Sequence, residues 1–419
     1  MKLNRRTFLG TSLATGAALA TPALAQAKPK VVVIGGGSGG GTCARYIAKD
    51  SDGAIDVTLV EANPVYTTCY FSNLYLGDFR TYDSLQHGYE TLAQSGVTVV
   101  NDTATGVDRD AKTVTLAGGD VLSYDKLVLA PGIDFVEGSV NGWNEAEHAE
   151  IMPHAWKAGP QTQLLKSQLE AMPEGGTFVM IAPPNPYRCP PGPYERVSMI
   201  AHLMTNINPT AKIMVLDPKD KFSKQGLFQD GWNRHYAGMI EWVGPDFGTG
   251  NITVMPDTME VDLDGEMIKA DVVNVIPGQM AGKIAGIAGV TDGNWAPVLP
   301  DAMQSKMDEN IHVLGDASAQ GDMPKSGFAA NSQAKVAAMA IRGALTGSRV
   351  FPAKYSNTCW SLLGTDDGVK VGASYESDGE KIASVGSFIS QVGEDADLRK
   401  ATYEESIGWY AGITTDIFG

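Results

Sequence analysis

The stretch "KPKVVVIGGGSGGGTCARYIAKD", residues 28–50, decides the fold of this chain. An apolar run at 31–34 is followed by Gly35, Gly37 and Gly40 in G-x-G-x-x-G spacing, with Ser38 in the loop, and then by a helical segment. The first glycine allows a tight turn, the second lets the backbone approach a pyrophosphate, and the third lets helix and strand pack closely. The stretch therefore predicts a strand, a phosphate-binding loop and a helix whose N-terminus attracts the phosphate.

A second strand follows in "DVTLVEANP", residues 56–64, and it ends at Glu61. An acidic residue at this point of a dinucleotide-binding unit accepts hydrogen bonds from a ribose. The glycine motif alone would be weak evidence. Strand, loop, helix, strand and terminal acid together favour a dinucleotide site.

Two later segments belong to the same predicted domain. "YDKLVLAPG", residues 124–132, predicts a buried strand with a tight turn at Gly132, and "NIHVLGDAS", residues 310–318, predicts another strand before Asp316. The segment 325–341 follows with helical character. We therefore expect a discontinuous dinucleotide-binding domain made of residues 28–150 and 270–345.

The same plan returns in residues 151–269. "GGTFVMIAPPNP" and "AKIMVLDPKD" repeat the two strands, with Asp217 in the place of Glu61, and apolar residues between them at helical spacing predict a helix: Val197, Ile200, Ala201 and Met204. The glycines of the loop are replaced by prolines, which offer few backbone N–H donors to a phosphate. We expect a second dinucleotide-type domain without a nicotinamide site, and a C-terminal α+β interface domain at 346–419.

The N-terminal segment, residues 1–27, carries Arg5 and Arg6 before a short stretch of small apolar residues and Ala-x-Ala sequences. This pattern predicts a cleaved twin-arginine export signal, and hence a periplasmic protein. No later apolar run is long enough to span a bilayer.

The net charge is −16, and it becomes −19 when Lys2, Arg5 and Arg6 are removed with the signal. An acidic surface disfavours binding to nucleic acid and anionic lipid, and it favours a basic soluble partner. Simple solubility explains the same charge equally well.

Several motifs carry a resemblance to a known family. They are the Gly35–Gly40 loop, "VYTTCYFSN" around Cys69, "PYRCPPGPYER" around Cys189, "GDAS" at Asp316, "PKSGFAANSQAK" and "NTCW" at Cys359. With these motifs the chain resembles the flavoprotein subunit of flavocytochrome c sulfide dehydrogenase, within the disulfide-reductase-like FAD family. The resemblance implies an α/β fold with two Rossmann-like, glutathione-reductase-like domains and bound FAD.

The chain has four cysteines, and their wide separation excludes the C-x-x-C spacing of zinc sites. Cys43, in the phosphate-binding helix, is typical of a small buried apolar residue. Cys69 matches the family position that carries an 8α-S-cysteinyl bond to FAD; a free core thiol is the alternative. Cys189 and Cys359 match the family's redox-active pair, for which a purely structural disulfide is the alternative.

The resemblance implies that sulfide attacks this disulfide by thiol–disulfide exchange and leaves a persulfide on one cysteine. Glu195 is a candidate proton carrier or a solvated surface carboxylate, and Arg188 is expected either to stabilise a thiolate or to cap the loop. Neither C-x-x-C-H nor a metal-binding histidine spacing occurs, so we predict no metal site in this chain and haem on a c-type cytochrome partner subunit.

Three other functions stay open at this stage. A sulfide:quinone oxidoreductase is the first, although the C-terminus lacks the basic amphipathic pattern of a membrane-surface helix. A flavoprotein subunit that modulates another sulfur-oxidising complex is the second. An NAD(P)H-dependent reductase is disfavoured by the proline-rich second loop.

Overall fold

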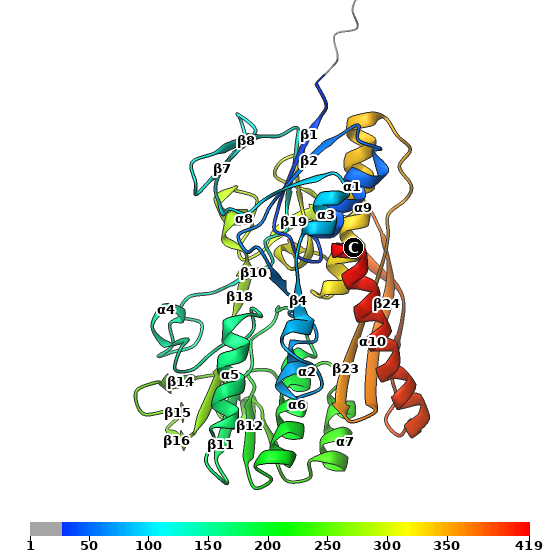
Figure 1. Ribbon diagram of the computed structural model, residues 1–419. Coiled ribbons are helices and arrows are strands. Elements are labelled where there is room, and N and C mark those ends of the chain that lie inside the picture. Colours follow the sequence, from blue (N-terminus) through cyan, green and yellow to red (C-terminus); the bar gives the residue numbers. More distant parts are fainter. Residues whose placement is uncertain (1–26) are drawn as a thin grey trace, which may run out of the picture.

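The computed structural model describes residues 27–419. The predicted twin-arginine signal, residues 1–27, lies outside the described residues except for Ala27. Figure 1 shows the first dinucleotide-type domain at one end of the molecule, the second at the other end, and the C-terminal segment along one side of both. The chain thus has the predicted mixed α/β fold.

The first domain is built on an eight-stranded sheet. In spatial order its strands are β22 (Ser318–Ala319), β19 (Ala296–Leu299), β20 (Gln304–Ser305), β21 (Ile311–Val313), β9 (Lys126–Leu129), β1 (Lys30–Ile34), β2 (Asp56–Val60) and β5 (Val97–Val100). The run from β21 to β5 is parallel. Val31 and Val33 have no exposed surface, as expected for a parallel strand covered on both faces.

Helices α1 (Gly40–Asp50) and α9 (Gly327–Thr346) pack against each other and contribute to the core of this sheet. Helix α9 confirms the helix predicted after Asp316. Shorter elements complete the domain: β3 (Tyr66–Thr67), η1 (Asp83–Leu85), β4 (Gln86–His87), α3 (Glu90–Gln94), β6 (Ala104–Asp108), β7 (Thr113–Leu116), β8 (Val121–Ser123), α8 (Lys283–Ile287) and η3 (Gly315–Ala317). Helix α2 (Ser72–Leu76) follows β3 in sequence but packs against helices of the second domain.

The second domain holds a four-stranded parallel sheet in the order β13 (Ile240–Val243), β12 (Lys212–Leu216), β11 (Thr177–Ile181) and β17 (Val272–Val275). Helix α6 (Gly192–Ile207) follows β11 and buries the four apolar residues whose spacing predicted it. The remaining elements are α4 (Glu145–His148), α5 (Pro160–Glu170), α7 (Gln225–His235), η2 (Pro245–Phe247), β14 (Ile252–Met255), β15 (Glu260–Leu263) and β16 (Glu266–Lys269).

The predicted domain boundaries at 150 and 270 need correction. Strand β17 pairs with β11 and therefore belongs to the second sheet. On the other side, Val140, Trp143 and Met152 lie in the apolar core of the second domain. The chain crosses between the domains in the antiparallel pair β10 (Ile133–Phe135) and β18 (Gln279–Ala281). The first domain therefore ends at β10 and resumes at β18, because these two segments pair with each other where the chain crosses between the domains.

The C-terminal segment forms an antiparallel sheet of β23 (Lys354–Gly364), β24 (Asp367–Ser377) and β25 (Ile382–Ile389), followed by α10 (Ala396–Phe418). Strand β23 contacts α9 of the first domain and both α6 and α7 of the second. The sheet therefore closes over the junction of the two domains (Figure 1). The sequence predicted an α+β segment here but not a helix as long as α10.

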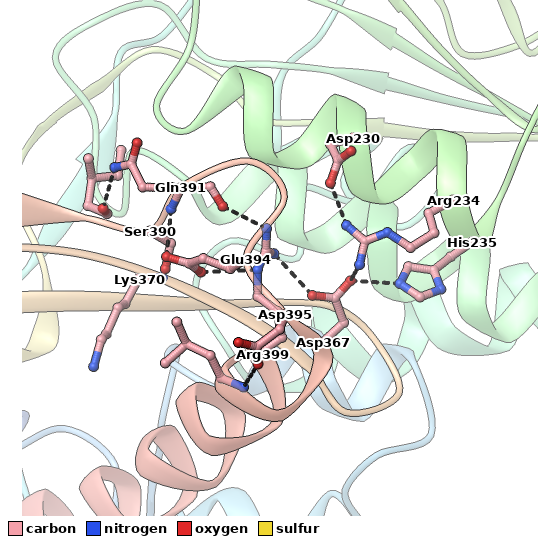
Figure 2. A network of polar contacts seen from close by, with 12 residues as sticks. Asp230, Arg234, His235, Asp367, Lys370, Ser390, Gln391, Glu394, Asp395 and Arg399 are labelled. Atoms are coloured by element: carbon pink, nitrogen blue, oxygen red, sulfur yellow. Dashed lines mark hydrogen bonds and ion pairs between the residues drawn. The ribbon is translucent and has the colours of Figure 1, made fainter.

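A network of hydrogen bonds and ion pairs around Asp367 connects the C-terminal segment to α7 of the second domain (Figure 2). Asp367 accepts hydrogen bonds from Arg399 of α10 at 3.1 Å, from Arg234 of α7 at 2.9 Å and from His235 at 2.7 Å. Glu394 forms an ion pair with Arg399 at 3.1 Å. The side chains of Arg399 and Asp367 are 1% and 5% exposed, so the network is buried at its centre.

Candidate functional site

A cleft of about 590 Å³ opens along the C-terminal ends of the strands of the first sheet. Seven of the eight predicted cofactor-binding residues line it: Gly35, Gly37, Ser38, Glu61, Cys69, Gly132 and Asp316. This volume lies within the range of about 300–1,000 Å³ that is typical of ligand and cofactor sites.

The glycine loop is as tight as its spacing predicted. Gly35 has a φ of +97°, and a Cβ atom there would lie 2.3 Å from the carbonyl oxygen of Ala130. Gly40 does not line the cleft, but a Cβ atom there would lie 1.8 Å from the carbonyl oxygen of Gly35. The first glycine is therefore required by the turn and the third by the close approach of α1 to the strand.

Glu61 lies directly after β2, where the sequence put it. Its Oε2 accepts a hydrogen bond of 2.7 Å from the backbone N–H of Gly36, and its Oε1 accepts one of 2.9 Å from the N–H of Asn63. These two bonds hold the carboxylate at the mouth of the glycine loop. A ribose hydroxyl in the cleft could donate to it.

Asp316 offers a direct test of whether a cofactor fits the cleft. Its Oδ1 is buried and has no hydrogen-bond partner within residues 27–419. Burial raises the pKa of this carboxyl, against the opposing charges of Arg188 and Lys325. A buried unpaired acceptor is costly unless a ligand supplies the donor. The hydroxyl-rich ribityl chain of FAD is a donor of that kind, so these residues fit the group.

The second domain does not present a carboxylate to a cleft in the way that the first domain presents Glu61. Asp217, the counterpart of Glu61, is fully buried, and it accepts hydrogen bonds from Tyr194 at 2.5 Å and from Trp242 at 3.0 Å. Its other oxygen pairs with Lys219 Nζ at 2.6 Å. The ring of Phe222 stacks on Tyr194 at 3.6 Å. The carboxylate that would bind a ribose is therefore already saturated by internal contacts.

A smaller cavity of about 80 Å³ adjoins the dinucleotide cleft, and Cys69 and Arg188 line both spaces. It brings together the three predicted catalytic residues, Cys189, Cys359 and Glu195. They come from the proline loop, from β23 and from α6. Aromatic side chains form much of the remaining wall: Tyr70, Phe71, Trp156, Phe328, Trp360 and Trp409.

All four cysteines are free thiols in this structure, so it contains no disulfide between Cys189 and Cys359. Cys43 is fully buried in the core beside β1, as its position in α1 predicted. Cys189 has a φ of 57°, and its N–H donates to the carbonyl of Lys325 at 2.8 Å. Burial raises the pKa of the Cys189 and Cys359 thiols.

Glu195 is not a solvated surface carboxylate. It lines the cavity, where its Oε2 accepts a hydrogen bond of 2.9 Å from the amide of Asn73 and its Oε1 accepts one of 3.0 Å from the N–H of Leu362. Burial raises its pKa, against the hydrogen bonds from Asn73 and Leu362. A carboxyl group with a raised pKa next to thiols is suited to proton transfer.

Arg188 does more than cap the loop. It is buried, its side chain donates to the carbonyl of Trp156, and its backbone N–H donates to Gln279 at 2.8 Å. Its charge lowers the pKa of Cys69, against the stronger effect of burial. Among the described residues, 27–419, no group of histidines, cysteines and carboxylates could hold a metal ion, and no helix is long and apolar enough to cross a membrane.

Two residues of the site were missed by sequence reasoning. Asn73 connects Glu195 to the buried Arg196, whose Nε donates to Asn73 at 3.2 Å. Lys224 donates to the carbonyl of Cys359 at 3.1 Å. Asn73 lies four residues after Cys69, which was its only visible sign in the sequence. Lys224 had none, because its hydrogen-bond partners, Cys359 and Ser361, come from a distant segment of the sequence.

Known proteins resemble the chain along most of its length. Residues 29–161 match the pyridine nucleotide-disulphide oxidoreductases. Residues 162–277 match the central part of the sulfide dehydrogenase (flavocytochrome c) flavoprotein chain, and residues 352–418 match the flavin-binding part of flavocytochrome c sulphide dehydrogenase. The flavoprotein chain of that enzyme from Chlorobaculum thiosulfatiphilum is 52% identical over 44 residues, which cover 10% of this chain and 90% of that sequence.

The chain belongs to the flavoprotein chains of flavocytochrome c sulfide dehydrogenase. It is therefore an FAD-binding oxidoreductase. A sulfide-quinone reductase from Aquifex aeolicus (strain VF5) is 34% identical over 110 residues, which cover 26% of this chain and only 25% of that relative.

Solved structures support the fold of this flavoprotein chain. The sulfide:quinone oxidoreductase of Aquifex aeolicus has a TM-score of 0.66 at 21% identity, and the match covers 93% of this chain and 92% of that one. The NAD-dependent persulfide reductase from A. fulgidus has a TM-score of 0.61 at 20% identity, and the match covers 90% and 77%. These similarities concern the fold alone.

Proposed function

We propose that the protein oxidises sulfide with the help of FAD and a redox-active disulfide between Cys189 and Cys359, and that it passes the electrons to a c-type cytochrome subunit. One observation carries this proposal: the two thiols and Glu195 share a cavity that adjoins the dinucleotide cleft at Cys69 and Arg188. The Chlorobaculum relative is a sulfide dehydrogenase (flavocytochrome c) flavoprotein chain, and this supports both the substrate and the partner.

FAD would be held by the glycine loop with Ser38, by Glu61 at the ribose, and by Gly132 and Asp316 farther along the cleft. When bound, FAD supplies an acceptor for the electron pair of the thiols and releases the electrons singly. We also propose a covalent 8α-S-cysteinyl bond at Cys69. In support of it, Cys69 lines both the cleft and the thiol cavity.

The chain's own residues would carry out the sulfur chemistry. HS⁻ forms a bond to one sulfur of the disulfide, and the S–S bond breaks with its electron pair on the other cysteine. The products are a persulfide and a thiolate, and no outside oxidant enters this step. Glu195, held by Asn73 and Leu362, is placed to carry a proton to or from these sulfurs, while Arg188 contributes positive charge on the side of Cys69.

The cytochrome partner and the periplasmic location complete the proposal. The sequence contains no haem-binding C-x-x-C-H motif, and its net charge of −16 suits a basic soluble partner. Arg5 and Arg6 support export by the twin-arginine pathway. The second candidate is a sulfide:quinone oxidoreductase, which is favoured by the 34% identity to the Aquifex reductase.

An anaerobic titration of the purified flavoprotein tests the proposal. We expect sulfide to bleach the flavin absorbance and NADH to leave it unchanged, because Asp217 is saturated by internal contacts. The sulfide-reduced protein is then mixed with a c-type cytochrome or with a soluble quinone. Faster reoxidation by the quinone would favour the second candidate, and bleaching by NADH alone would contradict both.

A further inference from the structure

Lys224 is a buried cation beside the proposed disulfide. It precedes α7, is 6% exposed, and has a φ of 62°, a conformation that is unusual for a residue with a side chain. Its Nζ donates to the carbonyl of Cys359 at 3.1 Å and to Ser361 Oγ at 2.8 Å. The ammonium group therefore lies against the part of β23 that carries Cys359.

No carboxylate neutralises this charge at close range. Two other buried lysines form ion pairs, Lys166 with Asp78 at 2.7 Å and Lys219 with Asp217 at 2.6 Å. Within residues 27–419, Lys224 has no carboxylate oxygen within 4.0 Å of its Nζ. A buried ammonium group without a nearby anion is costly, so its retention calls for a negative charge that forms during function.

The ionisable groups that face Lys224 are Cys359 on β23, Cys189 in the proline loop and Glu195 on α6. From α7, the centroid of the Phe228 ring lies 5.8 Å from Nζ. Burial lowers the pKa of Lys224 to about 8, although these three groups raise it. A thiolate formed here and the ammonium group would therefore stabilise each other.

We infer that Lys224 is the counter-charge for a thiolate on Cys359, so that Cys359 is the sulfur released when sulfide opens the disulfide. This inference rests on the proposed function. HS⁻ bonds to Cys189 Sγ, the S–S bond breaks, and its electron pair stays on Cys359 Sγ. The total charge does not change, but one negative charge moves from the incoming sulfide to the neighbourhood of Lys224.

Cys359 has a second contact that favours its thiolate. The amide nitrogen of Asn357 lies 3.4 Å from Cys359 Sγ and can donate to it. For Cys189, burial and the charges of Cys359, Glu195 and Cys69 all raise the pKa, and the charge of Arg188 opposes them. The contacts of Cys359 therefore favour a thiolate on this residue, and Cys189 carries the persulfide.

The test is alkylation of the dithiol-reduced holoprotein by iodoacetamide, read for each cysteine peptide by mass spectrometry between pH 6 and 10. Cys359 also lines a cavity of about 290 Å³, which gives a small reagent room to reach it. The variants are Lys224→Gln, which keeps a hydrogen-bond donor without the charge, and Lys224→Arg, which keeps the charge. Exposed Lys221→Gln is the matched control.

We expect Lys224→Gln to slow alkylation of Cys359 at pH 8 by about ten-fold, which corresponds to one pKa unit. Lys224→Arg should restore the rate, and Lys221→Gln should leave it unchanged. Equal rates for wild type and Lys224→Gln, or a loss confined to Cys189, would overturn the inference. A purely structural role would lower the melting temperature without shifting the pH profile of Cys359.

Two further readouts keep the test decisive. Buried Cys43 becomes reactive only if a variant unfolds. If a variant unfolds, the wild-type protein provides the test by itself. The inference requires that Cys359 be alkylated at lower pH than Cys189 in the same sample. The reverse order overturns the inference. None of these measurements uses sulfide, so failure of the proposed function appears separately, as a flavin that sulfide does not bleach.

Discussion

The side-chain amide of Asn73 donates a hydrogen bond of 2.9 Å to Glu195 Oε2, across 122 residues of sequence. The same amide nitrogen lies 3.1 Å from the carbonyl of Gly192, and the amide oxygen accepts from Arg196. Glu195 is thus held in one orientation toward the thiol cavity by a residue that follows closely after Cys69. This contact links the proposed flavin-attachment segment to the proposed proton carrier.

Glu195→Gln should slow flavin reduction by sulfide by about 100-fold, the usual scale for loss of a general acid or base. Because burial raises the pKa of Glu195, its acid form persists to higher pH than that of a free carboxyl group. Stopped-flow rates between pH 5 and 9 should therefore show a titrating limb in the wild type that the variant lacks, beside the limb of sulfide ionisation that both proteins share. Exposed Glu266→Gln should keep the wild-type profile, and identical pH profiles for the wild type and Glu195→Gln would exclude the assignment.

Cys189→Ser and Cys359→Ser should each lower the rate of flavin reduction by sulfide at least about 1,000-fold, because either change removes the disulfide. The flavin spectrum should remain that of a bound cofactor. Cys43→Ala is the matched control, since Cys43 lies in the core away from the cavity. Rapid reduction in either serine variant would rule out the disulfide mechanism.

Gly40→Ala should abolish FAD binding, or destabilise the protein by about 3 kcal/mol or more, because a Cβ atom would lie 1.8 Å from the carbonyl oxygen of Gly35. Gly412→Ala, at an exposed position of helix α10, meets no atom within 4 Å and should stabilise the protein by up to about 1 kcal/mol. Flavin content and urea unfolding of the two variants provide the comparison. Normal flavin content in Gly40→Ala would refute the packing argument.

Stability should fall in mild acid because of His312. Its Nδ1 contacts the carbonyl of Ala302 at 2.9 Å, and burial lowers its pKa from the ordinary value of 6.5 to about 4. Between these pH values the unfolded chain binds more protons, so stability present above about pH 6.5 is lost as the pH falls toward about 4. The loss is about 3 kcal/mol.

Urea unfolding at pH 7 and pH 4.5 measures this loss, and His312→Gln should reduce the difference between the two pH values. Lys126 adds a smaller charge effect in the same direction. An unchanged pH dependence in the variant would show that other groups cause it.

The network around Asp367 should contribute far more to the free energy of unfolding than a surface ion pair does (Figure 2). Asp367→Asn leaves the buried Arg399 without its full partner and should cost roughly 3–5 kcal/mol. Asp366→Asn breaks a pair with Lys400 in which both side chains are 51% exposed, and it should cost less than about 1 kcal/mol. Similar unfolding midpoints for the two variants would contradict the importance of burial.

Much of the fold was predictable from local pattern. Gly35 and Gly40 are required by sterics in the first turn, and the apolar run before them predicted the strand that the structure buries on both faces. The domain boundaries were misplaced because strand β17 and the segment 140–152 join the second domain through pairing and packing between distant residues. Local sequence carries no record of such contacts.

The sequence by itself determined the glycine loop, the acid after the second strand and the proline-rich loop, because each follows from backbone geometry within a few residues. It also supplied the cysteines and Glu195 as candidates. Only the tertiary structure decided that Cys189, Cys359 and Glu195 share one cavity with Asn73. It also decided that Lys224 donates a hydrogen bond to the backbone of Cys359. Burial and electrostatic environment arise from segments that are distant in sequence, so they exist only once the chain has folded.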